Sequence, residues 1–498
     1  MASLFSFENL YSAYLDCRRK KRGKKATQRF EVHAEEDLFA LAKELTDRSY
    51  HPSPSFCFVS RNDKFREVFA AQFRDRVVHH LIVRYLEKIW EPVFIHDSYA
   101  CRKGKGTHAA VNRLQSFSRK ITSNNTKRAW CLKLDIKAFF PSIDRRLLLD
   151  IVLSKLDNEE LRWLVEIIIL HDPANDAIFT CSASKWKNIP PHKSLFSVPE
   201  GKGLPIGNLT SQFFANIYLN PLDEFVKHTL KTRFYIRYVD DLVLLHESRE
   251  QLLIWNRQIG EFLHDVLKLV LHPDRQHVHP VSNGVNALGY IVRPSHLLLR
   301  RRVVDNCKRA IVSYQNRMMC QEKDGMDLIV TPERYKKFEA MMNSYLGIFS
   351  HASTFRLVQG LFQRFRVLRE LFVLENWRVI KRWEVPFCPR DLYTQYRFFR
   401  SRFRGVILFQ VGCFLEMFDK DAVWAKEHLG LAAITLRKDF YARCGVPMRI
   451  AESLLVRLLD NDLLLVMQSR YVHGRIADRV LSRVHFAEDR NLQLPILT

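Results

Sequence analysis

The sequence predicts an α+β protein built from several domains, and three observations support this fold class. Its 498 residues exceed the length that one hydrophobic core usually organises, so we expect two to four domains. Short apolar segments typical of strands alternate with segments in which apolar residues recur at helical spacing. Beyond about residue 300 helical patterns dominate, until Pro386 and Pro389 mark a boundary before a last segment of mixed character.

The helix and strand patterns can be placed in order along the chain. Helical spacing predicts helices over residues 34–45, 77–86, 145–156, 209–230 and 250–267. Apolar runs predict strands over residues 56–69, 130–134, 235–245 and 288–292. Asp144 stands where it can cap the helix that follows it, and Pro221 should bend the helix over 209–230. A loop rich in Pro, Gly, Ser and Lys is expected over 171–203.

The chain is strongly basic, with 78 Lys and Arg against 54 Asp and Glu and a formal net charge of +24. Such an excess is typical of proteins that bind a polyanion, most often nucleic acid, although a basic protein without such a partner is the alternative. A dense basic run covers Arg18 to Lys25. It is either a solvated flexible arm or a segment that contacts phosphates.

The cysteine pattern and the apolar runs exclude several classes of protein. The ten cysteines are scattered and form no C-x-x-C pair, which argues against a zinc ribbon or a disulfide framework and favours a reducing compartment. The start of the chain carries no secretory signal pattern, and apolar runs stay far below the ~20 residues of a membrane span. We therefore expect a cytoplasmic protein without a membrane partner.

Two adjacent carboxylates interrupt an apolar run in Tyr235-Ile236-Arg237-Tyr238-Val239-Asp240-Asp241-Leu242-Val243-Leu244-Leu245. Asp is depleted in strands, so the pair is expected at a tight turn between two strands, where both side chains point to one place. A turn that happens to contain Asp is the alternative. A third carboxylate, Asp135, ends the strand over 130–134. Together the three predict a site for two divalent ions, for which Mg²⁺ is suited.

A Gly- and Pro-containing segment, Gly203-Leu204-Pro205-Ile206-Gly207-Asn208-Leu209-Thr210-Ser211-Gln212, leads into the helix over 209–230. Such a turn lets the backbone approach a nucleotide closely, and an ordinary loop-to-helix junction is the alternative. His272, His277 and His279 lie close together in sequence, but they have no acidic or cysteine partners at ligand spacing. They are therefore interpreted as surface or phosphate-facing histidines and not as a metal site.

These motifs resemble those of reverse transcriptases. Asp135 in Leu134-Asp135-Ile136-Lys137-Ala138-Phe139-Phe140 and the Tyr-Val-Asp-Asp box are similar to motifs A and C of that family, and the resemblance runs from about Arg61 to about Leu371. Other collinear segments also fit the family: Phe73 to His80, Ser98 to His108, Pro190 to Phe196 and Asn343 to Gly347. The resemblance implies a right-hand polymerase with fingers, a palm containing an antiparallel sheet, and a helical thumb.

The activity that this resemblance implies is RNA-directed DNA synthesis. Its substrates would be dNTPs, its partners a template RNA and a cDNA/DNA duplex, and two Mg²⁺ ions would lie at Asp135, Ile136, Asp240 and Asp241. A non-catalytic nucleic-acid-binding scaffold that keeps the fold is the rival from another class. Retention of all three carboxylates argues against this rival.

The subfamily is indicated by the turn before the long helix. Group II intron and retron enzymes usually carry Gln-Gly where this chain has Ile206-Gly207, and the loop here ends in Ser211-Gln212. This variant resembles the reverse transcriptases of diversity-generating retroelements, which serve mutagenic retrohoming. That family copies a template-repeat RNA with errors at adenines, and the cDNA overwrites part of a target gene. The alternative is a bacterial defence or retron-like reverse transcriptase.

Further roles follow from the resemblance by position. Phe140 matches the aromatic gate that excludes a ribose 2′-hydroxyl, and Ile206 should loosen geometric checking of the incoming nucleotide. The remaining matches to nucleotide-binding positions are Lys64, Arg66, Gly207 and Gln212. The matches to nucleic-acid-binding positions in the fingers are Arg74, Arg102 and Lys103. The family more often has Phe-Leu-Gly where this chain has Ala287-Leu288-Gly289.

Residues from 396 to about 468 resemble a second family, the N-terminal mismatch-recognition domain of MutS proteins. The similarity lies in Val406 to Phe418 and in Gly445-Val446-Pro447-Met448 with its following helix. By resemblance, Phe414 would insert beside a mismatched base and Glu416 would contact that base, although Cys413 replaces the usual Asp. A buried core position is the alternative for Phe414. The chain has no G-x-x-x-x-G-K-[ST] loop, so the MutS ATPase is not expected.

The predicted organisation has four segments. They are a basic N-terminal extension (1–55), the fingers and palm (56–305), a helical thumb (306–385) and a small mixed α/β domain like MutS domain I (386–498), which would bind nucleic acid. An accessory nucleic-acid-binding protein is a further partner that we expect, and the resemblance implies a bacterial or phage-encoded enzyme.

Overall fold

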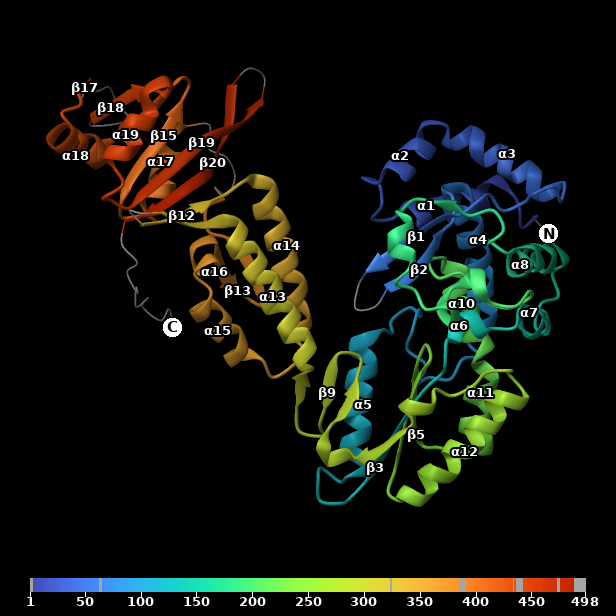
Figure 1. The fold of residues 1–498 in the computed structure, drawn as a ribbon. Coiled ribbons are helices and arrows are strands. Elements are labelled where there is room, and N and C mark those ends of the chain that lie inside the picture. The colour runs from blue at the N-terminus through green and yellow to red at the C-terminus, as the bar shows by residue number, and fades with distance from the viewer. Residues whose placement is uncertain are drawn as a thin grey trace. The chain divides into compact units, whose positions relative to one another are not determined.

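The computed structural model describes residues 3–61, 65–322, 325–384, 391–432, 434–435, 442–472 and 475–487. The chain divides into two compact units, residues 1–296 and 297–498, which are described separately (Figure 1). Within the described ranges, every helix falls short of the length and apolarity that a membrane-crossing segment needs. The predicted α+β class is confirmed, because both units combine helices with largely antiparallel sheets.

The first unit begins with three helices, α1 (Phe7–Arg18), α2 (Lys25–Val32) and α3 (Ala34–Thr46), which pack around the start of α4 (Phe73–Trp90). Their apolar faces are part of the main core of the unit. The basic run between α1 and α2 is exposed to solvent in a turn. It joins two packed helices, and whether it is only solvated or contacts phosphates stays a prediction.

The fingers contain a small sheet with strand order β2-β1-β4. Strands β1 (Phe56–Arg61) and β2 (Phe65–Ala70) form an antiparallel hairpin, and the short edge strand β4 (Ile178–Phe179) runs parallel to β1. The residues expected to form a loop over 171–203 contain this strand and three short helical turns. These turns are α9 (Ala183–Trp186), η1 (Pro191–Lys193) and η2 (Leu195–Ser197).

The palm is a four-stranded antiparallel sheet with strand order β5-β6-β3-β7, as the resemblance implied. Its strands are β3 (Trp130–Asp135), β5 (Phe234–Tyr238), β6 (Asp241–His246) and β7 (His277–Pro280). One face packs on α12 (Arg249–Asp265) through apolar side chains such as Trp255 and Ile259. The core therefore lies between this sheet and its helices.

Two of the predicted helices show how local sequence sets their ends. Asp144 caps α7 (Arg145–Leu153), because its carboxylate accepts hydrogen bonds from the backbone N–H groups of Arg146 (3.1 Å) and Leu147 (3.0 Å). The predicted helix over 209–230 is divided at Leu219 and not merely bent. It becomes α10 (Leu209–Tyr218), α11 (Asn220–Glu224) and a π-helical turn, η3 (Phe225–Thr229).

The other elements of the first unit connect these parts. The helices are α5 (Thr107–Ile121), α6 (Phe139–Ser142) and α8 (Glu159–Leu170), and the short turns are η4 (Pro273–Arg275) and η5 (Val281–Asn283). A last hairpin is formed by β8 (Val285–Ala287) and β9 (Tyr290–Val292).

The second unit begins with β10 (Leu297–Leu299) and the helices of the expected thumb. These helices are α13 (Arg301–Met318), α14 (Pro332–Phe349), α15 (Phe355–Arg364) and α16 (Arg366–Leu371). The sequence pattern missed two hairpins among them. One hairpin is β11 (Met319–Glu322) with β12 (Gly325–Ile329), and the other is β13 (Phe372–Glu375) with β14 (Arg378–Lys381).

The first of these hairpins joins the sheet of the C-terminal segment. That sheet has strand order β11-β12-β20-β19-β15-β16-β18-β17. Its C-terminal strands are β15 (Val406–Val411), β16 (Phe414–Phe418), β17 (Ile434–Thr435), β18 (Ala442–Pro447), β19 (Leu463–Val472) and β20 (Arg475–Phe486). The helices on it are α17 (Leu392–Arg400), α18 (Asp419–Leu429) and α19 (Ala451–Arg457), with the turn η6 (Met448–Ile450).

Candidate active site

Three carboxylates meet at one end of the palm sheet. Asp135 is the last residue of β3 and stands directly opposite Asp241, the first residue of β6. Asp240 precedes Asp241 in the tight turn between β5 and β6. The predicted meeting of these side chains is therefore seen in the fold, because antiparallel pairing of β3 with β6 brings together residues that are far apart in sequence.

The charges of these carboxylates act on one another. Burial, together with the nearby charges of Asp135 and Asp241, raises the pKa of Asp240 to about 6, against a usual value of 3.8. The guanidinium of Arg66 on β2 lowers it in part. The ionised form of Asp240 is destabilised in this way, and a nearby cation would stabilise it. Carboxyl groups with such shifted pKa values are frequent at functional sites.

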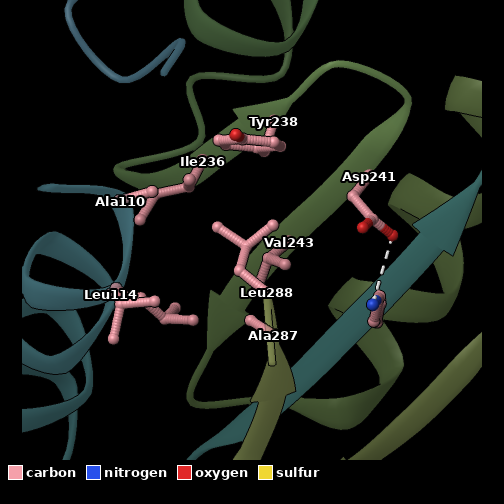
Figure 2. A pocket seen from close by; sticks show the side chains of 10 residues that line it. Ala110, Leu114, Ile236, Tyr238, Asp241, Val243, Ala287 and Leu288 are labelled. Carbon is pink, nitrogen blue, oxygen red and sulfur yellow. Dashed lines mark ion pairs between the residues drawn. The ribbon is translucent and has the colours of Figure 1, made fainter. Parts of the chain in front are cut away.

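Two basic side chains now neutralise the other carboxylates. Asp135 forms an ion pair with Arg275 from η4, and Asp241 forms one with Lys133 from β3 at 3.1 Å, which is the dashed line in Figure 2. Among the described residues, no three metal-ligating side chains are gathered tightly enough to hold an ion in this arrangement. The oxygen ligands and their mutual repulsion fit a hard divalent cation, which would take the place of these ion pairs.

A buried ionic network fixes the turn that carries Asp240. The guanidinium of Arg237 donates two hydrogen bonds through Nε and Nη2 to Asp223 (2.8 and 2.6 Å), and both side chains are fully buried. Arg237 also donates to the carbonyl oxygen of Val239 at 3.3 Å. Val239 has a φ of +54°, which is unfavourable for a β-branched residue. The contact from Arg237 therefore holds a backbone conformation that the local sequence would not adopt alone.

The same network reaches the fingers. Arg237 donates to the side-chain oxygen of Asn216 on α10 (3.1 Å), and the amide of Asn216 donates to the carbonyl oxygen of Ala100 (2.8 Å). The backbone N–H of Tyr99 donates to the carbonyl oxygen of Arg237 at 3.0 Å. The segment that contains Arg102 and Lys103 is in this way tied to the active-site hairpin.

A small apolar pocket lies beside Asp241. Figure 2 shows Ala110 and Leu114 from α5 close to Ile236 and Val243 of the palm hairpin. Ala287 and Leu288 close another side of this pocket. The segment in which the sequence departs from the family pattern therefore lines a pocket next to Asp241.

The predicted nucleotide-binding residues lie on elements that converge here. The carbonyl oxygen of half-buried Phe140 on α6 accepts a hydrogen bond from Leu204 (2.9 Å), and that of Ile206 accepts one from Phe69 on β2 (2.8 Å). Gly207 has a φ of +131°, and a Cβ there would meet the carbonyl oxygen of Phe69 at 2.5 Å. A glycine is required at this close approach.

Three other predicted positions differ in their surroundings. Arg66 is exposed on β2. Gln212 is exposed on α10, where its side-chain oxygen accepts a hydrogen bond from the thiol of Cys101 at 3.3 Å. Lys64 lies outside the described residues.

The predicted nucleic-acid contacts in the fingers are engaged within the protein. Arg74 pairs with Glu44 at 2.5 Å, and the nearly buried guanidinium of Arg102 pairs with Glu91 at 2.9 Å. Lys103 pairs with Glu87 at 2.5 Å, but its side chain is 86% exposed. The structure therefore assigns packing contacts to both arginines, and a contact of any of the three with nucleic acid stays a prediction.

The two predicted residues of the C-terminal domain lie on β16 and differ in exposure. Phe414 is 41% exposed at the start of the strand, so the buried-core alternative is wrong. Glu416 is 5% exposed and forms an ion pair with Arg443 on β18. An exposed ring therefore stands beside a neutralised carboxylate.

Sequence reasoning missed the residues that position and balance the carboxylates. Arg237 and Lys133 were read only as parts of strands, and Arg275 was not singled out. The signal for Arg237 is a charged residue in an otherwise apolar strand, because a buried charge requires a partner. Its partner Asp223 lies on another element and could not be named from spacing.

Comparisons with known proteins agree with this geometry. A family model described as reverse transcriptase (RNA-dependent DNA polymerase) matches residues 54–292, and one described as MutS domain I matches residues 391–471. Protein YkfC of Escherichia coli is 23% identical over 53% of this chain and 72% of its own length. The group II intron-encoded protein LtrA of Lactococcus lactis is 22% identical over 52% of this chain and 50% of its own length.

A solved structure of apo telomerase from Candida tropicalis covers 52% of this chain and 59% of that one, with 11% identity and a TM-score of 0.36. That similarity is too low to define the fold by itself. Residues 54–292 match the reverse transcriptase family, and these findings support an enzyme of the RNA-directed DNA polymerase class. A domain that matches MutS domain I follows it.

Proposed function

We propose that this enzyme copies an RNA template into cDNA with two Mg²⁺ ions bound at Asp135, Asp240 and Asp241, with Ile136 beside them. The observation that carries the proposal is the meeting of three carboxylates at one strand end, where burial and the charges of Asp135 and Asp241 raise the pKa of Asp240 to about 6. When bound, the metal ions supply activation of the 3′-hydroxyl and charge stabilisation on the phosphates. LtrA is about twice as long as the part of it that this chain matches, so template and partners belong to the proposal.

The residues of the chain have separate roles in this scheme. Arg66, whose charge already acts on Asp240, binds the triphosphate of the dNTP. Phe140 closes the sugar site against a 2′-hydroxyl. Lys133 and Arg275, which pair with Asp241 and Asp135, would be free to contact phosphates once metal ions took over the charge of these carboxylates. An Arg or Lys at a transferring phosphoryl group stabilises the charge that develops there.

We also propose that the enzyme belongs to a diversity-generating retroelement and copies adenines with frequent errors. The support is Ile206, which stands where a polar side chain is usual in the family and whose carbonyl oxygen accepts a hydrogen bond from Phe69 on β2. An apolar side chain makes no hydrogen bond that would report the geometry of the nascent base pair. The exposed Phe414 further supports a role of the C-terminal domain in reading mispaired cDNA duplexes.

Primer extension on a defined RNA tests the catalytic assignment. Asp240→Ala should lose at least about 10³-fold in rate, because it removes a ligand of the reacting ions. The matched control is Asp265→Asn, which changes an exposed carboxylate at the end of α12 and should act like wild type. Equal rates for wild type and Asp240→Ala would refute the proposal.

Sequencing of the cDNA tests the fidelity assignment. Wild type should show errors concentrated at template adenines, and Ile206→Gln should reduce them without loss of overall synthesis. An even distribution of errors over the four template bases would instead favour a bacterial defence or retron-like reverse transcriptase.

A further inference from the structure

Three aromatic side chains form a cluster on the fingers, which we name the aromatic platform: the exposed Phe179 and Phe196 and the half-buried Trp186. The rings of Phe179 and Phe196 are stacked, with centroids 5.4 Å apart and an interplanar angle of 26°. Trp186 meets both rings edge-on, at 5.2 and 5.8 Å. Phe179 is 56% exposed and Phe196 40% exposed. Rings left this accessible mark an interaction surface more often than a core.

The aromatic platform is rigidly attached to the fingers sheet. The buried carboxylate of Glu67 on β2 accepts hydrogen bonds from the hydroxyl of Ser194 (2.7 Å) and the backbone N–H of Leu195 (2.8 Å). Two residues along the same strand, Phe69 packs against Phe196 at 5.6 Å. The exposed rings are therefore held in place before any ligand arrives, which lowers the entropy lost on binding.

Lysines surround the aromatic platform in sequence and leave their charge available. Lys185 and Lys187 flank Trp186, and Lys193 stands three residues before Phe196. All three are exposed, and no ion pair joins them to a carboxylate in the part of the chain that the structure describes. Aromatic rings interleaved with unpaired cations are the combination that binds single-stranded nucleic acid, because the rings stack on bases and the cations contact phosphates.

The aromatic platform is connected to the active site through β2. Phe69, which contacts Phe196, donates its backbone N–H to the carbonyl oxygen of Ile206 at 2.8 Å. Arg66, three residues earlier on this strand, is near enough to Asp240 to lower its pKa. Strand β2 therefore approaches Asp240 through Arg66 and supports the aromatic platform through Phe69.

We propose that the aromatic platform binds the unpaired template strand ahead of the position being copied, an inference that rests on the proposed function. Only unpaired bases expose a face for stacking on protein rings, whereas the bases of the product duplex stack on one another. The partner is therefore single-stranded nucleic acid, and the RNA template is the strand that remains unpaired in front of the polymerase.

Fluorescence anisotropy with the full chain and a labelled RNA–DNA hybrid tests this proposal. One hybrid is blunt, and the other carries a template overhang of about ten nucleotides, within the span of known single-strand sites. Wild type should bind the overhang hybrid more tightly. Phe179→Ala/Phe196→Ala should lose about tenfold in affinity for that hybrid and keep its affinity for the blunt one, since each stacked base contributes roughly that much.

Two further variants separate stacking from damage to the fold. Phe179→Tyr/Phe196→Tyr keeps both rings and should keep the overhang affinity. Phe39→Ala removes a ring that is 60% exposed on α3 and should leave both affinities unchanged. The proposal is overturned if wild type binds both hybrids equally, if the alanine variant weakens both equally, or if the tyrosine variant loses affinity as the alanine variant does.

The test also separates this proposal from the proposed function. Wild type that extends primers but gains no affinity from the overhang would remain a polymerase without a template platform. A DNA overhang in place of RNA distinguishes the sources of the single strand: similar affinities support stacking on any unpaired base. If the alanine variant keeps its affinity for both hybrids and loses only its binding to a protein partner, the proposal is overturned.

Discussion

The molecule contains two antiparallel hairpins with acidic residues near the turn. In one hairpin the carboxylates repel one another, and in the other the carboxylate is neutralised by an arginine. In the palm hairpin β5–β6, Asp240 and Asp241 face Asp135 across the sheet, and repulsion contributes to the raised pKa of Asp240. In the C-terminal hairpin β15–β16, the acidic residue Glu416 is paired with Arg443, and the exposed group is the ring of Phe414.

The difference separates two kinds of nucleic-acid chemistry. A group of carboxylates that repel one another lacks positive charge, and metal ions that take phosphate oxygens as further ligands would provide it. A carboxylate that is already neutralised needs no metal ion, and the exposed ring beside it is suited to insertion between the bases of a duplex. Variants in each hairpin test this difference.

The largest effect is expected from the buried support of the palm hairpin. Arg237→Met leaves the carboxylate of Asp223 buried without its partner, which should cost about 3–5 kcal/mol of unfolding free energy and abolish primer extension. Urea unfolding followed by far-UV circular dichroism measures the loss, and primer extension measures the activity.

The matched control is Arg443→Met in the other hairpin. Arg443 is 39% exposed, so water can replace its contact with Glu416 in part, and we expect a smaller loss of unfolding free energy than for Arg237→Met, with primer extension retained. Equal losses for the two variants would show that the palm network has no special role in holding the turn.

The active-site carboxylates could be predicted from sequence because their positions are local. Asp135 ends an apolar strand, and Asp240-Asp241 interrupts another, so strand pairing alone brings them together. The ion pair of Arg237 with Asp223 could not be predicted, since it depends on how α11 packs under the sheet. The same holds for Lys133, whose charge reaches Asp241 only through the register of β3 with β6.

The fold of the second unit was predicted less completely. The sequence pattern beyond residue 300 is mainly helical, and two hairpins within it were missed. The dipeptide Asp324-Gly325 is a hairpin signal that could have indicated the first one. Its pairing with the C-terminal sheet could not be foreseen, because β12 and β20 are distant in sequence.

A smaller effect is expected at the C-terminal hairpin. Phe414→Ala should reduce the preference of the chain for a mismatched duplex by about tenfold, since it removes the ring that would unstack a base step. Primer extension on a matched template should not change. Competition between matched and mismatched DNA duplexes, followed by anisotropy, measures the preference.

The control for this variant is Ile450→Ala, which removes a side chain that is 49% exposed in η6. It should leave the mismatch preference intact. If wild type itself binds matched and mismatched duplexes equally, the C-terminal hairpin does not read mismatches, and the contrast between the two hairpins is reduced to the palm site.

A graded effect is expected from pH, and it concerns the palm hairpin alone. Because the pKa of Asp240 is raised to about 6, its carboxylate is ionised above that pH and protonated below it. Between pH 7 and pH 5 single-nucleotide incorporation should fall by about tenfold at limiting Mg²⁺, and added Mg²⁺ should move the midpoint to lower pH because it competes with the proton.

In the absence of metal, the stability of the fold should decrease as pH rises, whereas nucleotide incorporation should increase. A carboxyl group whose folded pKa lies above its unfolded value binds more protons in the folded state, so this group's contribution to stability falls as pH rises from about 4 to about 6. Asp240→Asn removes the unfavourable charge of the ionised carboxylate in the folded state. The melting temperature of this variant should therefore exceed that of wild type at pH 7 but not at pH 4. A difference that is independent of pH would contradict the repulsion of Asp240 by Asp135 and Asp241, on which the contrast between the hairpins depends.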